Sequence, residues 1–524
     1  MQLLERVGLG MPGRYSIGAT DMAHLGDVSP LGRAHRTWLA LCTWALFVAT
    51  IPMPLLYHSN QNTKFLHGLA QAWPERLGAD WTAGTVDGLP AFTHLVYLIA
   101  EYGDPVLFYA LEVLMLGIMC LSLLALARLV GRGSGQGLAF TLITGSLLVI
   151  FVHDWQDDNL RGVAGQYLTH GYLQPAEFGI LFLPAFLLAQ RGHPAGLLLA
   201  AIPAAFHPAY IAYSGAMLAV FLVHRWRDGL GIPKMVTLAA LALLILPPLD
   251  LSIRFAPTDP VTFAKANEIL AFERIPHHSD PSHWFDFAAF RKLLVAVLAI
   301  AVAPRGPLQS GLIVLLVIAA GGTAVVWLTR SAELALVAPW RASVIIAPVS
   351  VAILSGWVVD RVLRVLPTRR GQLVATLPFL GYALFAATDG AGDKLRLVRT
   401  SQPANYVAFA RDSFKPGDSY LASPAHSSFR LDALVPHYVT WKTHPYLDTE
   451  VLAWRRRVEL ADAVFGASEA GSAEVPFDCG ALDRLMAETP VTHLMIRNAA
   501  TAEYATCDRL ELLHASDGWI YRVH

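Results

Sequence analysis

The chain has 524 residues, of which 55% are hydrophobic and only 15% are charged. This composition is too apolar for a water-soluble protein and predicts many membrane-spanning helices. The formal net charge is −1, which argues against the strongly basic surface of a nucleic-acid-binding protein, and we expect no nucleic-acid partner.

The polar segment 1–36 lacks the apolar core and cleavage site of a signal peptide, so it is predicted to be a cytoplasmic N-terminal segment. Apolar runs that span a bilayer, or nearly so, then recur through a transmembrane domain at 37–388. Run 194–226 exceeds the ~20 residues of one span, and His207-Pro208 divides it into two. This predicts eleven spans: 37–57, 105–130, 136–152, 177–190, 194–206, 209–223, 235–251, 288–303, 308–329, 342–359 and 373–388.

The distribution of positive charge predicts the orientation. Cytoplasmic loops carry the excess of Lys and Arg, and with eleven spans the flanking cations fall on one side. The loops that begin at His58, His153, Ser252 and Arg330 then lie outside a bacterial cytoplasmic membrane, as does the tail. The predicted cytoplasmic cations are Arg33, Arg36, Arg128, Arg132, Arg191, Arg225, Arg227, Lys234, Arg305, Arg361, Arg364, Arg369 and Arg370.

The tail, 389–524, has a different pattern. Strand-like runs at 438–442, 492–497 and 519–523 alternate with helical patterns at 449–465 and 482–488, which predicts a small periplasmic or extracellular α/β domain. The external location permits a Cys479–Cys507 disulfide, the alternative being two free thiols. The predicted fold is a polytopic α-helical membrane protein with about 11 transmembrane helices and a C-terminal extracytoplasmic α/β domain.

Acidic residues concentrate in the first two external loops. Asp80 and Asp87 lie in the first, and the alternative for Asp80 is a loop aspartate that begins a short interfacial helix. Asp154, Asp157, Asp158 and Arg161 lie in the second and are candidates for binding a substrate, and the three acids could also hold a divalent cation. The alternative is a solvated, helix-capping group with Arg161 as its structural partner.

Basic and imidazole residues lie on the same predicted face. His207 is at the tip of the broken helix pair, and Arg341 follows Pro339-Trp340 at a helix start, where it can grip phosphate or anchor the helix. The segment RIPHHSDPSHW (274–284) contributes Arg274, His277 and His278. Zinc binds such residue types, but no second set of ligands with diagnostic spacing follows in the sequence. We therefore expect this segment either to contact a phosphate or a sugar or to be a structural loop.

Acidic, basic and imidazole groups that converge at one membrane face suit an anionic lipid head group. Transfer from a lipid-linked donor needs cations for its phosphate, a carboxylate to deprotonate an acceptor hydroxyl and an apolar groove for the lipid. Asp80 or one of the second-loop acids, Asp154, Asp157 and Asp158, can supply this carboxylate. In the tail, Trp441, Lys442, His444 and 455–457 are interpreted mainly as building the domain and its contact with the membrane part, with acceptor binding as the alternative.

The polytopic core, the acidic first external loop and the external α/β domain together resemble the GT-C superfamily of membrane glycosyltransferases. NQNTKFLHGL…DW…FTHL, RIPHHSDPSHW, PWRAS and YVTWKTHPYLDTEVLAWRRR are similar to an uncharacterised bacterial family of that shape. The resemblance implies that an acidic residue of the first external loop is the base, a role that falls on Asp80, with Asp87 as its rival. The paired-acid motif usual in that loop is absent here.

The sequence therefore predicts a glycosyltransferase that uses a polyprenyl-phosphate-linked sugar donor outside the cytoplasmic membrane. Its partners would be membrane lipid and a glycan, lipid or protein acceptor. The metal site is unknown: a divalent cation is an open alternative that the sequence does not require. The competing functions are a transporter or flippase of lipid-linked glycans and a non-catalytic protein of envelope glycan assembly. A transporter is expected to carry charged residues within its spans and related halves, and neither is evident.

Overall fold

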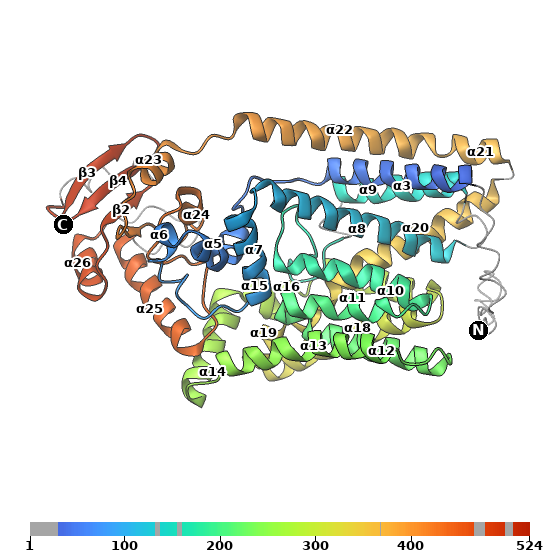
Figure 1. The fold of residues 1–524 in the computed structure, drawn as a ribbon, viewed down its shortest axis with the longest axis horizontal. Coiled ribbons are helices and arrows are strands. Elements are labelled where there is room, and N and C mark those ends of the chain that lie inside the picture. The colour runs from blue at the N-terminus through green and yellow to red at the C-terminus, as the bar shows by residue number, and fades with distance from the viewer. Residues whose placement is uncertain (1–29, 132–136, 155–159, 367, 466–476, 498–506) are drawn as a thin grey trace.

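The computed structural model describes residues 30–131, 137–154, 160–366, 368–465, 477–497 and 507–524, with side chains from residue 37 onward. Asp157 and Asp158 lie outside these ranges. A bundle of long helices forms one end of the molecule, and a small domain with a sheet forms the other (Figure 1). The loops that were predicted to be external pack between them.

Each of the eleven predicted spans coincides with a helix or with two consecutive helices. The helices of the bundle are α3 (Pro30–Thr50), α8 (Val106–Val130), α9 (Leu138–Asp154), η2 (Pro175–Leu181), α10 (Phe182–Gln190), α11 (Ala195–Phe206), η3 (Pro208–Tyr210), α12 (Ile211–Arg227), α13 (Lys234–Arg254), α17 (Phe287–Val302), α18 (Pro307–Thr329), α20 (Ser343–Val365), α21 (Arg369–Val374) and α22 (Leu377–Thr400).

Length and hydropathy identify five segments of the described chain that can cross a membrane: Val106–Val130, Lys234–Arg254, Pro307–Thr329, Ala332–Val365 and Arg369–Thr400. The chain therefore carries apolar helices of membrane-spanning length, and the count of eleven stays a prediction. The expected break at His207 is present, because α11 ends at Phe206 and α12 begins at Ile211. The last helix, α22, continues to Thr400, past the predicted start of the tail at 389.

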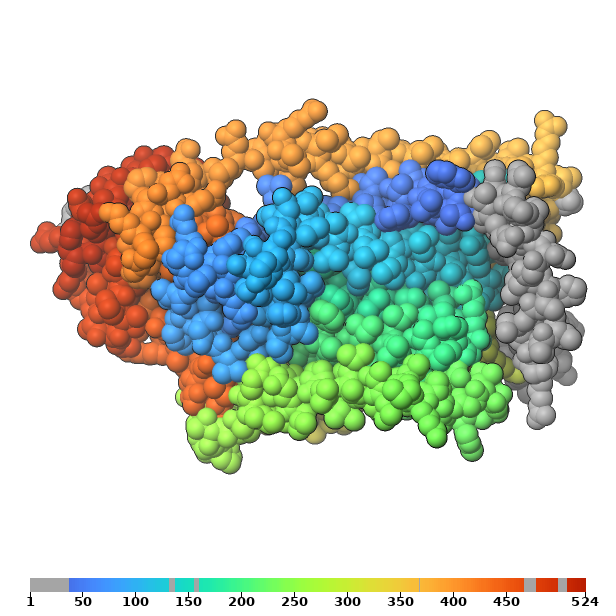
Figure 2. Space-filling view, in the orientation of Figure 1, coloured from blue at the N-terminus to red at the C-terminus, as the bar shows by residue number. Residues whose placement is uncertain are grey.

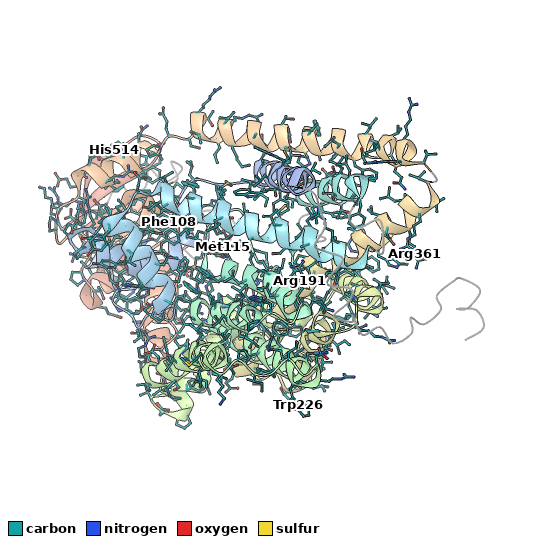
Figure 3. The ribbon with its side chains drawn as sticks, turned by 45° about the vertical axis from the view of Figure 1, so that its right-hand side comes forward. Phe108, Met115, Arg191, Trp226, Arg361 and His514 are labelled. Atoms are coloured by element: carbon teal, nitrogen blue, oxygen red, sulfur yellow. A yellow bond between two sulfur atoms is a disulfide. The ribbon has the colours of Figure 1, made fainter. Side chains whose placement is uncertain are left out.

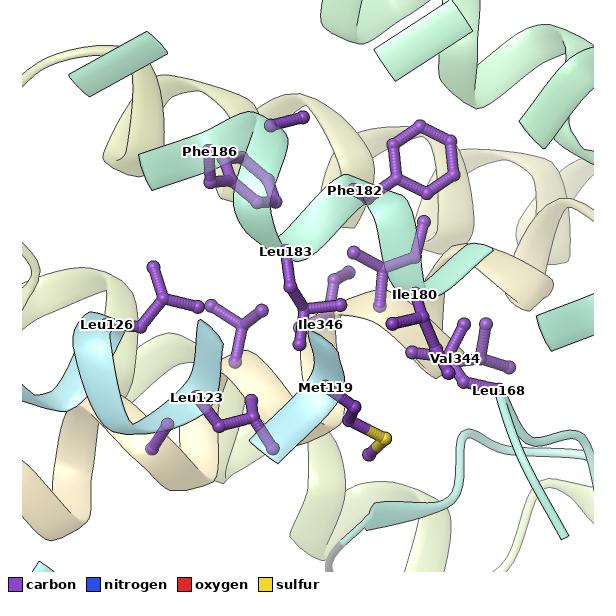
Figure 4. Close-up of a cluster of buried hydrophobic side chains, with 14 of the residues drawn as sticks. Met119, Leu123, Leu126, Leu168, Ile180, Phe182, Leu183, Phe186, Val344 and Ile346 are labelled. Atoms are coloured by element: carbon purple, nitrogen blue, oxygen red, sulfur yellow. The ribbon is translucent and has the colours of Figure 1, made fainter. Parts of the chain in front are cut away.

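The bundle is held by contacts between large apolar side chains. α20 packs along α8, and α11 packs against α10 and α13. Figure 4 shows one part of this core, in which Met119 and Leu123 of α8 meet Leu183 of α10 and Ile346 of α20. α22 lies on α3 and α9 at the edge of the bundle (Figure 1).

Short helices connect the bundle to the second domain. They are α4 (Gln61–Lys64), α5 (Leu66–Ala72), α6 (Pro74–Leu77), α7 (Pro90–Tyr102), α14 (Pro260–Glu268), η4 (Ile269–Arg274, a π-helix), α15 (Pro276–Ser279), α16 (Pro281–Trp284), α19 (Ala332–Val337) and η5 (Pro339–Ala342). In Figure 2 the first of these, drawn in blue, cover the surface between the helices and the C-terminal domain. Arg361, a predicted cytoplasmic cation, and His514 of that domain lie at opposite ends of the molecule (Figure 3); the orientation in a membrane stays a prediction.

The C-terminal domain contains a four-stranded sheet in the order β1-β2-β4-β3. β1 and β2 are parallel, whereas β4 is antiparallel to both β2 and β3. Trp454 and Leu482 pack with the sheet residue Leu494 in one core. The elements are α23 (Asn405–Ser413), β1 (Tyr420–Leu421), α24 (Phe429–Ala433), α25 (Asp448–Phe465), α26 (Cys479–Glu488), β2 (His493–Ile496), β3 (Leu510–Ala515) and β4 (Trp519–Val523).

The prediction of a strand at 438–442 was wrong. The segment begins beside β1, where Tyr438 N donates to the carbonyl of Tyr420 at 2.8 Å. It then turns, because the Thr440 hydroxyl accepts a hydrogen bond from the Thr443 backbone N at 3.1 Å. This side chain to backbone bond replaces a strand ladder and directs the following residues toward the bundle.

Candidate functional site

Positively charged and imidazole side chains gather where the external loops meet the C-terminal domain. Four strong cations come from α4, η4, η5 and the loop that precedes α25, and four histidines interact with them electrostatically. Segments far apart in the sequence therefore contribute to one site. We call this group the cationic cluster, and its members are Lys64, His207, Arg274, His277, His278, Arg341, Lys442 and His444.

Arg341 is oriented by two side chains from other loops. Its Nε donates to Oε1 of Gln166 at 3.1 Å, and its Nη1 donates to Nε2 of His207 at 2.8 Å. The preceding residue, Trp340, is buried and donates from Nε1 to the carbonyl of His278 at 2.8 Å. Because η5 is tied to three loops, the guanidinium of Arg341 has a fixed position.

Arg274 and Lys442 join the histidine loop to the C-terminal domain. Nη2 of Arg274 donates to the carbonyl of Lys442 at 2.8 Å, and the guanidinium lies 6.0 Å from the ring centre of Trp441. Nε of Arg274 is buried and has no hydrogen-bond partner. The Lys442 ammonium reaches the hydroxyl of Ser59 at 2.9 Å. Arg274 thus retains one N–H group, at Nε, that can donate to a ligand.

Lys64 and Tyr446 form the edge of the cluster. The Lys64 ammonium donates to the Tyr446 hydroxyl at 3.0 Å. The Tyr446 side chain is 45% exposed, and its ring packs against Gly88, where an added Cβ would lie 3.3 Å from a ring carbon. Gly88 follows Asp87, so this aspartate of the first external loop lies beside the cationic cluster.

Ion pairs do not neutralise the positive charge of the cluster in the described part of the chain. None of its four strong cations forms an ion pair with a carboxylate there. Burial, with Arg274 nearby, lowers the pKa of Lys442 to about 8. Burial and neighbouring cations lower the pKa of His278 to about 4, so this histidine is neutral near pH 7. Burial raises the pKa of Tyr446, but three neighbouring cations of the cluster bring it below its ordinary value.

The four strong cations are half-buried, and charges of one sign that are partly withdrawn from water are costly unless a partner of the opposite sign is present. The arrangement is therefore suited to binding an anion, and the mixture of Arg and Lys donors matches phosphate oxygens.

An apolar cavity of about 480 Å³ adjoins the cluster. It is enclosed by α16, α17, α18, η5 and α20, and Trp340 forms part of its wall. Phe285, Trp327 and Leu328 line the cavity and are also exposed on the outside of the bundle. The cavity therefore offers an apolar chain a place beside η5, the same short helix that carries Arg341.

Asp80 lies in a buried ion pair. Its Oδ2 is 2.8 Å from Nε of Arg430 in α24, and the two side chains are 0% and 1% exposed. Oδ1 accepts from the backbone N of Thr82 at 2.9 Å, and Oδ2 accepts from the backbone N of His437 at 2.9 Å. This carboxylate joins the first external loop to the C-terminal domain, and both of its oxygens are occupied by protein donors.

Asp87 is half-buried and has a different environment. Oδ1 accepts from the backbone N of Leu89 at 2.8 Å, and its backbone carbonyl accepts from Nη1 of Arg254 at 2.6 Å. In the described part of the chain its carboxylate forms no ion pair. Of the two predicted bases, Asp87 is the one that retains carboxylate capacity next to the cluster.

The acidic second loop does not join the cluster through Asp154. Oδ1 of Asp154 lies 2.6 Å from Nδ1 of His153, and Nε2 of His153 lies 3.2 Å from Oδ2 of Asp389, so Asp154 is linked through His153 to α22. Arg161 donates to Nδ1 of His170 at 2.6 Å and lies over the ring of Tyr167. The described residues include no group of three or more side chains placed to hold a metal ion.

The structure thus brings His207, Arg274, His277, His278 and Arg341 of the predicted site together. Sequence reasoning did not select Lys64 and Tyr446, and it interpreted Lys442 and His444 mainly as structural. The only signal for these residues was their position in external segments. Their convergence depends on the docking of the C-terminal domain onto the loops.

Comparison with known proteins gives limited information. A domain of unknown function, DUF6798, matches residues 404–461, the segment that includes α24 and the Trp441–Tyr446 loop. No curated protein matches the chain. Among solved structures, the arabinosyltransferase EmbB from Mycobacterium smegmatis is similar over 98% of this chain, with 13% identity and a TM-score of 0.33. The match covers 47% of that chain, so the present chain spans about half its length.

Proposed function

We propose that the protein is a membrane glycosyltransferase that transfers a sugar from a polyprenyl-phosphate-linked donor to an acceptor. The position of η5 between the cavity and the cationic cluster supports this proposal. Trp340 lines the apolar cavity, and the next residue, Arg341, belongs to the cluster. A prenyl chain in the cavity would present its phosphate to Arg341, on the side of the bundle that carries the C-terminal domain. We assign this side to the external face of the bacterial cytoplasmic membrane.

The proposed chemistry uses the two kinds of charge at the site. A carboxylate takes the proton from an acceptor hydroxyl, and the hydroxyl oxygen forms a bond to the anomeric carbon. The bond between that carbon and the phosphate oxygen breaks, and its electron pair stays on the polyprenyl phosphate. Positive groups fixed around that oxygen stabilise the developing charge without reorganising. Arg341 and Arg274 carry this role in the proposal.

We assign the base to Asp87 and a structural role to Asp80. A base must reach the acceptor hydroxyl with a free oxygen, and Asp87 lies next to Gly88, on which Tyr446 packs. Asp80 is fully buried and holds Arg430. The resemblance to GT-C enzymes implies a base in the first external loop, with Asp80 as the first choice. Our assignment keeps the base in this loop but gives the role to Asp87.

The test is a transfer assay with the purified full-length protein in detergent and a panel of radiolabelled polyprenyl-phosphate sugars. Sugar is expected to leave the lipid for an acceptor or for water, and Asp87→Asn is expected to reduce the rate at least about 100-fold while leaving the melting temperature unchanged. Asp393→Asn, at an exposed position on α22, is the matched control and should retain activity. Full activity of Asp87→Asn would remove Asp87 from the mechanism. If liposomes show the lipid crossing the bilayer with its sugar intact and no transfer occurs, a flippase would replace the proposal.

A further inference from the structure

The amount of positive charge at the site bears on the kind of phosphate that it binds. Lys64, Arg274, Arg341 and Lys442 carry four formal charges, and within the described ranges none is in an ion pair with a carboxylate. Burial and neighbouring cations lower the pKa of the cluster histidines, so they add little charge near pH 7. A sugar attached to a lipid through one phosphate carries a single negative charge, which leaves most of this charge unmatched.

The four cations also lie in two groups. Arg341 is fixed from the membrane side by Gln166 and His207, next to the cavity wall. Arg274 and Lys442 are joined to each other, and Lys64 donates to Tyr446, which lies in the same C-terminal-domain loop as Lys442. The positive region therefore extends from η5, beside the cavity wall, to the C-terminal domain.

The two groups belong to one electrostatic region. The charge of Arg341 lowers the pKa of Tyr446, although Tyr446 is hydrogen-bonded to Lys64 of the other group. In the same way, the charge of Lys64 lowers the pKa of His207, although His207 is hydrogen-bonded to Arg341. The charge of Arg274 lowers the pKa of both His278 and Lys442. For an anion with charge at two linked centres, each centre would have its own group of cations.

We propose that this site binds a lipid diphosphate, with the phosphate next to the lipid chain at Arg341 and the second phosphate at Arg274, Lys64 and Lys442. The inference rests on the proposed function and narrows its donor to a diphosphate-linked sugar. The sugar would then lie toward Tyr446 and the Asp87-Gly88 turn. In this arrangement the C-terminal domain supplies part of the donor site, through Lys442 and Tyr446, and is required for diphosphate binding.

The experiment compares four probes on the purified full-length protein in detergent: farnesyl diphosphate, farnesyl monophosphate, inorganic pyrophosphate and inorganic phosphate. Dissociation constants are measured by calorimetry at fixed ionic strength, because phosphate binding depends on salt. Farnesyl diphosphate is expected to bind at least about 10-fold more tightly than the monophosphate, the effect of one additional charge-assisted contact. It should also bind more tightly than inorganic pyrophosphate, because the cavity accepts the chain.

Variants locate the second phosphate. Lys442→Met and Lys64→Met remove one charge each at similar volume, and each is expected to weaken farnesyl diphosphate about 10-fold while changing the monophosphate less than about 2-fold. Retained monophosphate binding shows that these variants are folded. Arg484→Met, at an exposed position on α26, is the control and should bind both lipids as the wild type does.

Any other result would contradict either the diphosphate inference, the lipid assignment or the donor of the proposed function. Equal affinity for the two lipids, or equal effects of Lys442→Met on both, would show a single-phosphate site and overturn the inference while the proposed transferase stands. Equal affinity for inorganic pyrophosphate and farnesyl diphosphate would show a site for a free anion and overturn the lipid assignment. Binding of none of the four probes would overturn both the inference and the donor of the proposed function.

Discussion

Nε of Arg430 lies 2.8 Å from Oδ2 of Asp80, and both side chains are buried at the contact between the first external loop and the C-terminal domain. Burial lowers the pKa of Arg430, and the Asp80 carboxylate opposes this effect. The pair therefore depends on both partners: removal of either leaves an uncompensated charge inside the protein. This contact fixes the C-terminal domain in the position that brings Lys442 and Tyr446 to the cationic cluster.

Asp80→Asn is expected to destabilise the protein. Breaking a buried ion pair by removing one partner costs about 3–5 kcal/mol, so the melting temperature in detergent should fall and limited proteolysis at the start of α23 should accelerate. Arg430→Met should show the same losses, and the double variant should recover part of the stability because no unpaired charge remains. If Asp80→Asn instead kept the wild-type melting temperature and lost only transfer, Asp80 would be the base.

The case of Asp80 shows how far the sequence leads. A position between the long helices was readable for His207, Arg274, His278 and Arg341 because charged residues between apolar runs mark loops, and the structure brings these four together. The choice between Asp80 and Asp87 was not readable, because it depends on which aspartate meets Arg430.

The same limit applies to the edge of the cluster. Lys64 and Tyr446 are 382 positions apart in the chain. Their contact follows from domain docking, which no local pattern encodes.

Arg341→Gln is expected to weaken lipid-phosphate binding about 10- to 100-fold, because a charge-assisted donor to the phosphate is lost. Arg341→Lys should restore little of the affinity, since an ammonium cannot reproduce the planar contacts with Gln166 and His207. Binding of farnesyl monophosphate by calorimetry measures both effects. Arg305→Gln, at the predicted cytoplasmic end of α17, is the control. Wild-type affinity in Arg341→Gln would place the phosphate elsewhere.

Lys442 gives the cluster a pH dependence. Its pKa is lowered to about 8, whereas a free lysine titrates near 10.4. Phosphate monoesters are fully ionised above their second pKa of about 6. The affinity for farnesyl diphosphate is therefore expected to change little between pH 7.0 and 7.5 and to fall from pH 8 to 9.5 as Lys442 loses its charge, whereas the affinity for farnesyl monophosphate should change less than about 2-fold. His278, with a pKa of about 4, is neutral throughout this range.

The stability of the empty protein should respond to the same titration with the opposite sign. Below pH 8 the folded state keeps Lys442 charged against the effect of burial. Between about pH 8 and 10.4 the unfolded state binds the additional proton, so the Lys442 contribution to stability rises with pH. Wild-type and Lys442→Met melting temperatures, compared from pH 7 to 9.5, isolate this contribution. If the two curves stay parallel while the affinity also shows no step, the titration assigned to Lys442 is wrong.

The Cys479–Cys507 disulfide, the first of the two predicted states of these cysteines, is present in the structure and links the start of α26 to the segment before β3 across a separation of 28 residues. Closing a loop of this size stabilises the folded state by about 3–4 kcal/mol in the chain-entropy description. Cys479→Ser with Cys507→Ser is expected to make the sheet more sensitive to protease. It should leave the helical bundle folded, since the bundle core at Leu183 and Ile346 does not include the sheet. Far-ultraviolet circular dichroism and mass spectrometry of the proteolytic fragments measure the two parts separately.

The same variant separates the two phosphate positions, because Lys442 and Tyr446 belong to the destabilised domain. Farnesyl monophosphate binding through Arg341 should persist after the sheet is cleaved. Loss of this binding together with the sheet would mean that the C-terminal domain also holds the first phosphate.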